Sequence, residues 1–217
     1  MSLDMVLSEP EYLAKVLEQK LPFCYMREGI PYRVQSTPVA VTSCSMDGSG
    51  KGWFELRVPR IPQYILMALY MFFEQVADMY ETEVRVQCFY DSVSKEYTLY
   101  LPRQEVTSMS VYTLEAEYAY MSDQRWPVLD IHSHCRFPAM WSLVDNANEL
   151  GNWVFGVIGS IGHSPKMHLR VGTGGNFMDV DQDIIFDLSI TNDVKARFLA
   201  ERLFAETKEK LSLVENH

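Results

Sequence analysis

The stretch VLDIHSHCRFPAMWSLVDNANE, Val128 to Glu149, decides the fold because it joins an apolar strand to the start of a helix. Two histidines flank one serine at the end of the predicted strand, and Ser-Leu-Val-Asp begins after seven further residues. Two interpretations fit this local pattern. One is a metal site, and the other is a buried strand that runs into a capped helix.

Length and charge restrict the class of protein. The chain has 217 residues, enough for one domain of ordinary size with a substantial core, and 47% hydrophobic with 22% charged residues is typical of a soluble globular protein. The net charge of -10 and the scattered 19 Lys and Arg argue against nucleic acid and against an anionic membrane as partners. A protein or small-molecule substrate is favoured.

The cysteines and the apolar runs indicate where in the cell the protein is expected. The four cysteines, Cys24, Cys44, Cys88 and Cys135, contain no CxxC pair, which argues against a disulfide framework and against a cysteine zinc site. MSLDMVLSEP lacks the basic segment and apolar core of a signal peptide. The longest apolar run, YILMALYMFF, is shorter than the roughly 20 residues of a membrane span. We expect a cytoplasmic protein.

The pattern of apolar residues predicts an α+β fold. A helix capped by Ser8 is expected over residues 9–20, a second over 62–80, and a C-terminal helix capped by Asn192. The second helix has one apolar face, made of Ile65, Leu66, Leu69, Phe72, Phe73, Val76 and Met79. Strands are predicted at 32–43, 52–59, 83–91, 96–102, 108–118, 126–134, 153–162, 167–172, 176–181 and 184–190.

These elements predict a mixed β-sheet of six or more strands flanked by helices. The strands at 83–91 and 96–102 form a hairpin, the strand at 126–134 is central, and 184–190 closes the sheet. Residues 1–58 are interpreted as a small N-terminal α+β appendage and residues 59–217 as the main domain.

The histidines and the following Ser-Leu-Val-Asp have a geometry suited to metal binding. In a strand, residues i and i+2 point the same way, so His132 and His134 present two imidazoles on one face, which Asp130 shares. If Ser142 opens a helix, Asp145 lies one turn further on and can face back toward the strand end. Two histidines and an aspartate, with one position left for water, are the ligand set of a catalytic zinc site.

The alternative interpretation uses the same residues structurally. Ser142 and Asp145 are spaced as in a capping box, in which the serine accepts from a first-turn N–H group. A buried pair of histidines can be satisfied by backbone groups.

The complete pattern resembles a known family. His-Ser-His, seven residues, Ser, two residues, Asp is similar to the signature of the JAMM, or MPN-plus, metalloprotease family, and it is complete here as His132, His134, Ser142 and Asp145. The resemblance extends from about Pro62 to Leu188. It implies a JAB/MPN-like, cytidine-deaminase-like architecture, and the short GSIGHSPK segment resembles compact prokaryotic JAB-type members. Residues 89–106 and the N-terminal region also resemble proteins of the plasmid-borne PRTRC cassette.

The resemblance implies a role for each site residue. His132, His134 and Asp145 hold Zn2+, a glutamate is the general base, and Ser142 donates to the oxyanion. The family glutamate opens a strand some fifty residues before the histidines, which matches Glu83, 49 residues before His132; Glu81 is the alternative.

Two departures from the family pattern concern Cys135 and the residues after the glutamate. Cys135 replaces the usual proline after the second histidine, and its thiol can compete as a ligand or make the site sensitive to oxidation. The common Gly-Leu pair after the glutamate is also replaced, by VRVQC.

The expected function is therefore zinc-dependent hydrolysis of an amide bond in a protein or peptide, at the C-terminus of a ubiquitin-like protein. A peptidase unrelated to ubiquitin-like tags uses the same chemistry. The non-enzymatic alternative is a scaffold of the same fold that binds partners in a plasmid or conjugation-like cassette.

Overall fold

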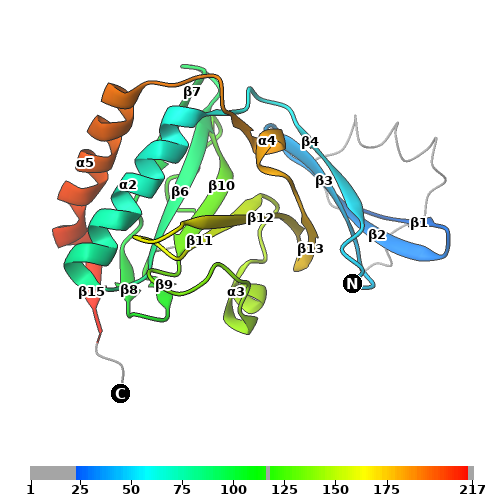
Figure 1. The fold of residues 1–217 in the computed structure, drawn as a ribbon. Helices are drawn as coiled ribbons and strands as arrows, with labels where there is room; N and C mark the ends of the chain where they lie inside the picture. Colours follow the sequence, from blue (N-terminus) through cyan, green and yellow to red (C-terminus); the bar gives the residue numbers. More distant parts are fainter. Residues whose placement is uncertain (1–22, 116–117, 215–217) are drawn as a thin grey trace. The chain divides into compact units, whose positions relative to one another are not determined.

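The structure is a computed structural model that describes residues 23–115 and 118–214 (Figure 1). Its fold is α+β, as predicted. The chain forms two compact units: the first contains the described residues up to Pro59 with Trp141–Phe155 and Leu169–Val180, and the second contains the rest. The predicted helix over 9–20 lies outside the described residues, and the division into 1–58 and 59–217 stays a prediction.

A four-stranded antiparallel sheet makes up much of the first unit. Its strands are β1 (Phe23–Arg27), β2 (Ile30–Ser36), β3 (Ala40–Ser45) and β4 (Gly52–Leu56), paired in that order. The single strand predicted over 32–43 is wrong, because the chain turns at Thr37, whose hydroxyl accepts from the Ala40 N–H. Pro38 lies in this turn and cannot donate to a ladder. Buried Tyr25 and Tyr32 stack with ring centroids 5.1 Å apart.

Two long helices pack against each other in the second unit. Helix α2 (Gln63–Tyr80) confirms the predicted helix and buries all of its expected apolar face except Met79, which is exposed. Helix α5 (Asp193–Lys210) begins at Asn192, whose side-chain oxygen accepts from the Lys195 N–H at 2.9 Å. The two helices lie side by side (Figure 1).

A six-stranded sheet carries the histidines. Its hydrogen-bonded order is β13-β12-β11-β10-β6-β7. The bounds are β6 (Val84–Asp91), β7 (Glu96–Tyr100), β10 (Arg125–Ser133), β11 (Val154–Gly159), β12 (Lys166–Thr173) and β13 (Asn176–Asp179). The β6–β7 hairpin and the interior position of β10 are confirmed. A β-bulge between Pro127 and Leu129 shifts the register of β10 against β6.

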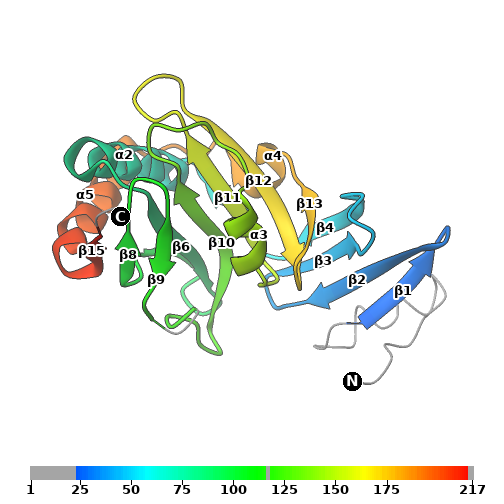
Figure 2. The same cartoon turned by 90° about the horizontal axis from the view of Figure 1, so that it is seen from below.

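Two predicted strands do not join this sheet. Among its described residues, the run at 108–118 contributes only β9 (Val111–Thr113). This strand pairs with β8 (Gln104–Val106) beside β15 (Leu211–Leu213), as Figure 2 shows. The first residues of the run instead form a turn, in which the Thr107 N–H donates to the Ser110 carbonyl.

The run at 184–190 also differs from the prediction. It divides between helix α4 (Gln182–Ile185) and the two-residue β14 (Phe186–Asp187), which pairs with β5 (Ile61–Pro62). A short apolar run is compatible with either helix or strand, so its pattern could not decide between them. Within the described part of the chain, none of the helices combines the length and apolar content of a membrane span.

Candidate metal centre

Strands β10 and β6 carry a row of polar side chains on one face. The antiparallel register pairs His132 with Arg85 and Asp130 with Gln87 and ends with Ser133 opposite Val84. Glu83 and His134 are the next residues beyond this last pair, so the same alternation would put them opposite each other. Directly opposite residues share a face, and alternate residues along a strand point the same way. The row therefore consists of Glu83, Arg85, Gln87, Asp130, His132 and His134.

The two histidines are buried and close together. Their ring centroids lie 5.0 Å apart, and 2% of His132 and 8% of His134 is exposed. The Nδ1 atom of His134 lies 3.2 Å from the carbonyl oxygen of Pro138. Because a carbonyl only accepts, this hydrogen bond requires the proton on Nδ1, so Nε2 is the ring atom that could bind a metal.

The backbone after His134 is held by the end of β11. The His134 N–H donates to the Ile158 carbonyl at 2.8 Å. In the other direction, the Ile161 N–H donates to the Cys135 carbonyl at 3.0 Å and the Ser160 N–H to the Phe137 carbonyl at 2.7 Å. At Gly159 an added Cβ would lie 2.2 Å from the Ala139 nitrogen, so only glycine lets the loop approach this closely. The loop that carries the Pro138 carbonyl is thus fixed by β11.

Cys135 has a backbone conformation that proline cannot adopt. Its φ is 48°, in the left-handed region, whereas proline is locked near −65°. Burial raises the pKa of the Cys135 thiol, and the carboxylates of Glu83 and Glu81 raise this pKa further, whereas Arg136 lowers it. Because proline cannot adopt this φ, a proline at position 135 would require a different backbone turn.

A short helix carries the carboxylate. Helix α3 (Leu143–Asn148) begins at Ser142, whose Oγ accepts from the Asp145 N–H at 3.1 Å, while Asp145 Oδ2 accepts from the Ser142 N–H at 2.7 Å. This is the capping box of the second interpretation. The capping box uses Oδ2 of Asp145 and thereby fixes the direction of this side chain. Oδ1 is the other oxygen of the same carboxylate.

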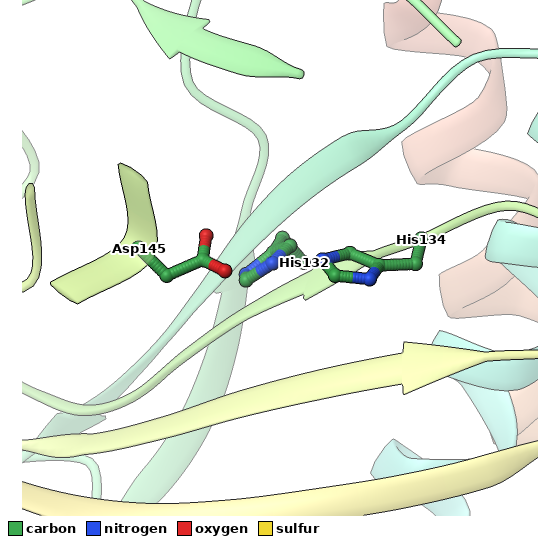
Figure 3. A group of neighbouring side chains, drawn as sticks. All are labelled: His132, His134 and Asp145. Carbon is green, nitrogen blue, oxygen red and sulfur yellow. The ribbon is translucent and has the colours of Figure 1, made fainter. Parts of the chain in front are cut away.

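The histidines and the aspartate form one cluster. One ligand atom from each of His132, His134 and Asp145 can be chosen such that all three lie within 4.8 Å of one another, and both histidines are buried. Figure 3 shows the carboxylate of Asp145 directed toward the imidazoles. Two imidazoles and a carboxylate are donors that bind divalent transition metals. This group could bind a metal ion, and the capped helix presents its carboxylate. The capped-helix interpretation is therefore confirmed, and the metal site is compatible with it and stays a prediction.

The two candidate glutamates differ in their surroundings. Glu83 is buried, with 6% exposed, and its N–H donates to the Thr107 carbonyl at 2.8 Å. Glu81 is exposed and ends α2 with a left-handed φ of 53°. Its burial and its place beside the histidines therefore favour Glu83 over Glu81 as the glutamate that the resemblance implies.

Asp130 and Ser133 have partners on β6. Asp130 forms an ion pair with Arg85 Nε at 3.0 Å and accepts from Gln87 Nε2 at 3.4 Å. Ser133 Oγ accepts from the Val84 N–H at 3.2 Å, a contact that joins the two strands.

Sequence patterns did not indicate the residues that anchor α3. Arg170 on β12 and Glu149 at the end of α3 are both buried, with 4% and 1% exposed. They form an ion pair in which Arg170 Nε and Nη2 donate to one carboxylate oxygen of Glu149. The only signal available from the sequence was a charged residue within the short apolar run LRVG.

Comparison of the sequence with models of known protein families gave no match, and comparison with curated proteins gave none. The resemblance to the JAMM family therefore rests on the sequence motif alone and stays a prediction.

Proposed function

We propose that this protein is a zinc metallopeptidase of the JAMM type, with a JAB/MPN-like fold, that hydrolyses an amide bond in a protein substrate. The observation that carries the proposal is the clustering of His132, His134 and Asp145 within 4.8 Å. The α+β fold, with the histidines at the end of an interior strand, supports it.

The ligand set fits zinc. Catalytic zinc sites use three protein ligands of nitrogen and oxygen type and leave a position for water. Zinc bonds of about 2.0–2.1 Å hold tetrahedral ligand atoms roughly 3.4 Å apart. Side-chain rotations that move each donor atom by about 1 Å would therefore bring the three donors to this separation. The hydrogen bond from His134 Nδ1 to Pro138 orients one of the rings, as metal-binding histidines require.

The chain's own residues supply the proton transfers. Zinc, when bound, lowers the pKa of water toward neutrality and polarises the substrate carbonyl. Glu83 lies in the same row as the histidines, and its buried carboxylate accepts a proton from the attacking water and delivers it to the leaving amine. Ser142 Oγ accepts from the Asp145 N–H, so its own O–H can donate to the oxyanion.

The proposed substrate is a protein or peptide, with the C-terminus of a ubiquitin-like protein as the preferred class. The resemblance to the JAMM family supports this choice. The net charge of -10 disfavours nucleic acid as substrate.

Metal analysis of matched variants tests the proposal. We expect one zinc per chain in the wild type and in Glu83→Ala, and loss of zinc in His134→Ala. His163→Ala is the matched control, because His163 is exposed and outside the cluster. Full zinc occupancy in the His132→Ala/His134→Ala double variant would refute the metal assignment.

A cleavage screen against ubiquitin-like fusions and unrelated peptides tests the reaction. We expect Glu83→Ala to lose hydrolysis while keeping zinc, and Glu81→Ala to keep both. If the zinc-loaded wild type cleaves neither class, the protein is better described as a binding scaffold. If Glu81→Ala is the inactive variant, the general base has been misassigned.

A further inference from the structure

Helix α3 contains Asp145 and is capped by Ser142, but it has little apolar anchorage. None of its six residues is buried, and Leu143 at its start is 86% exposed. A helix this short is not stable by itself, and most helices in proteins are held by an apolar face packed on the core. The position of Ser142 and Asp145 therefore depends on contacts of another kind.

Arg170 provides such contacts at both ends of the helix. Its Nη1 donates to Asn146 Oδ1 at 2.6 Å, and its Nε donates to Glu149 Oε2 at 2.9 Å. Its guanidinium carbon lies 3.9 Å from the ring centroid of Trp141, the residue directly before Ser142. It also lies 3.7 Å from the ring centroid of Phe177. All of these residues belong to the first compact unit.

This arrangement uses the specific chemistry of arginine. The planar guanidinium contacts two aromatic rings while its N–H groups donate in fixed directions, which lysine cannot reproduce. A buried ion pair is retained only with good geometry and further hydrogen bonds, and Arg170 has donors directed at both Glu149 and Asn146.

We propose that Arg170 is a positioning residue that fixes α3 and thereby holds Asp145 and Ser142 in place for the metal site. The part of this inference that concerns the metal rests on the proposed function. The part that concerns the helix does not.

Hydrogen exchange of the metal-free full chain tests the hold on the helix. Arg170→Met/Glu149→Leu removes both charges, so that no carboxylate is left buried without its cation. Arg170→Lys keeps the positive charge but loses the planar guanidinium and its fixed N–H directions. The amides of Asn146 and Glu149, which donate within α3, should lose protection about 10-fold or more in the double variant and less in Arg170→Lys. Amides of β6 should be unchanged.

Arg125→Met is the matched control. The guanidinium carbon of Arg125 also lies over an aromatic ring, 4.1 Å from the ring centroid of Tyr120. Arg125 is the first residue of β10 and is not part of α3 or its caps. Unchanged protection of Asn146 and Glu149 in the double variant, or an equal loss in Arg125→Met, would overturn the proposal.

A zinc titration tests the link to Asp145. The double variant should bind zinc about 10–100-fold more weakly than the wild type, and should cause no further loss when introduced into Asp145→Ala. Additive losses would mean that Arg170 acts on the histidines or on general stability, and would overturn the link. If the wild type binds no zinc, the proposed function fails, while the exchange measurement still decides whether Arg170 fixes α3.

Discussion

Gly159→Ala tests whether β11 controls the orientation of His134. The new Cβ would lie 2.2 Å from the Ala139 nitrogen, 2.4 Å from the Phe137 oxygen and 2.5 Å from the carbonyl carbon of Pro138. All three neighbours are backbone atoms, so no side-chain rotation can relieve the overlap. The loop that supplies the acceptor for His134 Nδ1 must move.

The size of the effect follows from these distances. Ordinary contacts between such atoms are about 3.5 Å, so the loop has to retreat by roughly 1.3 Å. Overpacking of this kind costs about 1–3 kcal/mol, and loss of the hydrogen bond from His134 to Pro138 adds about 1 kcal/mol. For a protein of this size the sum lowers Tm by about 5–15 °C. Zinc affinity should fall about 10-fold, as for other changes to residues that orient a ligand.

Thermal unfolding and zinc titration of one variant pair measure both effects. Gly48→Ala is the control, because Gly48 has a φ of 75° but no atom within 4 Å of an added Cβ. It should lose about 1–2 kcal/mol through backbone strain without any change in zinc affinity. A wild-type Tm for Gly159→Ala would refute the fixed position of the loop. Equal zinc affinity in the two variants would refute the dependence of His134 on that loop.

Two further predictions concern stability. Burial acts to raise the pKa of the Glu115 carboxyl, but hydrogen bonds from Tyr100, from the Arg103 N–H and from Lys210 outweigh it and lower this pKa below the usual 4.5. The ionised carboxylate therefore stabilises the fold at neutral pH, and this stabilisation is lost as the pH falls through the folded-state pKa. In urea unfolding, Glu115→Gln should lower the free energy of unfolding by about 1–3 kcal/mol at pH 7 and by much less at pH 3. An equal difference at both pH values would contradict this. Asn192→Ala removes the cap of α5 and should lower Tm by about 2–4 °C, whereas the neighbouring Thr191→Ala should leave it unchanged.

Local patterns predicted the elements that local chemistry determines. The spacing of Ile65, Leu69 and Phe72 predicted α2, because a buried helical face repeats every three to four residues. The spacing of Ser142 and Asp145 predicted the capping box, since both partners lie within one turn. Alternation along β10 likewise placed both histidines on one face.

Features that depend on distant parts of the chain were not predictable in the same way. Arg170 binds residues 21 and 24 positions earlier in the sequence, and nothing in LRVG indicates those partners. The pairing of β15 with β8 joins Leu211 to Gln104, and neither segment has a strong strand pattern. The prediction that 184–190 joins the main sheet failed because apolar residues there pack as a helix end and a two-residue strand.

The β-bulge in β10 has a consequence for the chemistry of the site. The pairing that starts with Arg125 opposite Asp91 would, without the extra residue, continue to place His132 opposite Val84. Glu83 would then lie opposite Ser133 and point to the other side of the sheet, away from both histidines. One additional residue, Val128, is thus what gives the proposed base and the proposed metal ligands a common face. The site can be lost through a change of spacing alone, with all of its side chains retained.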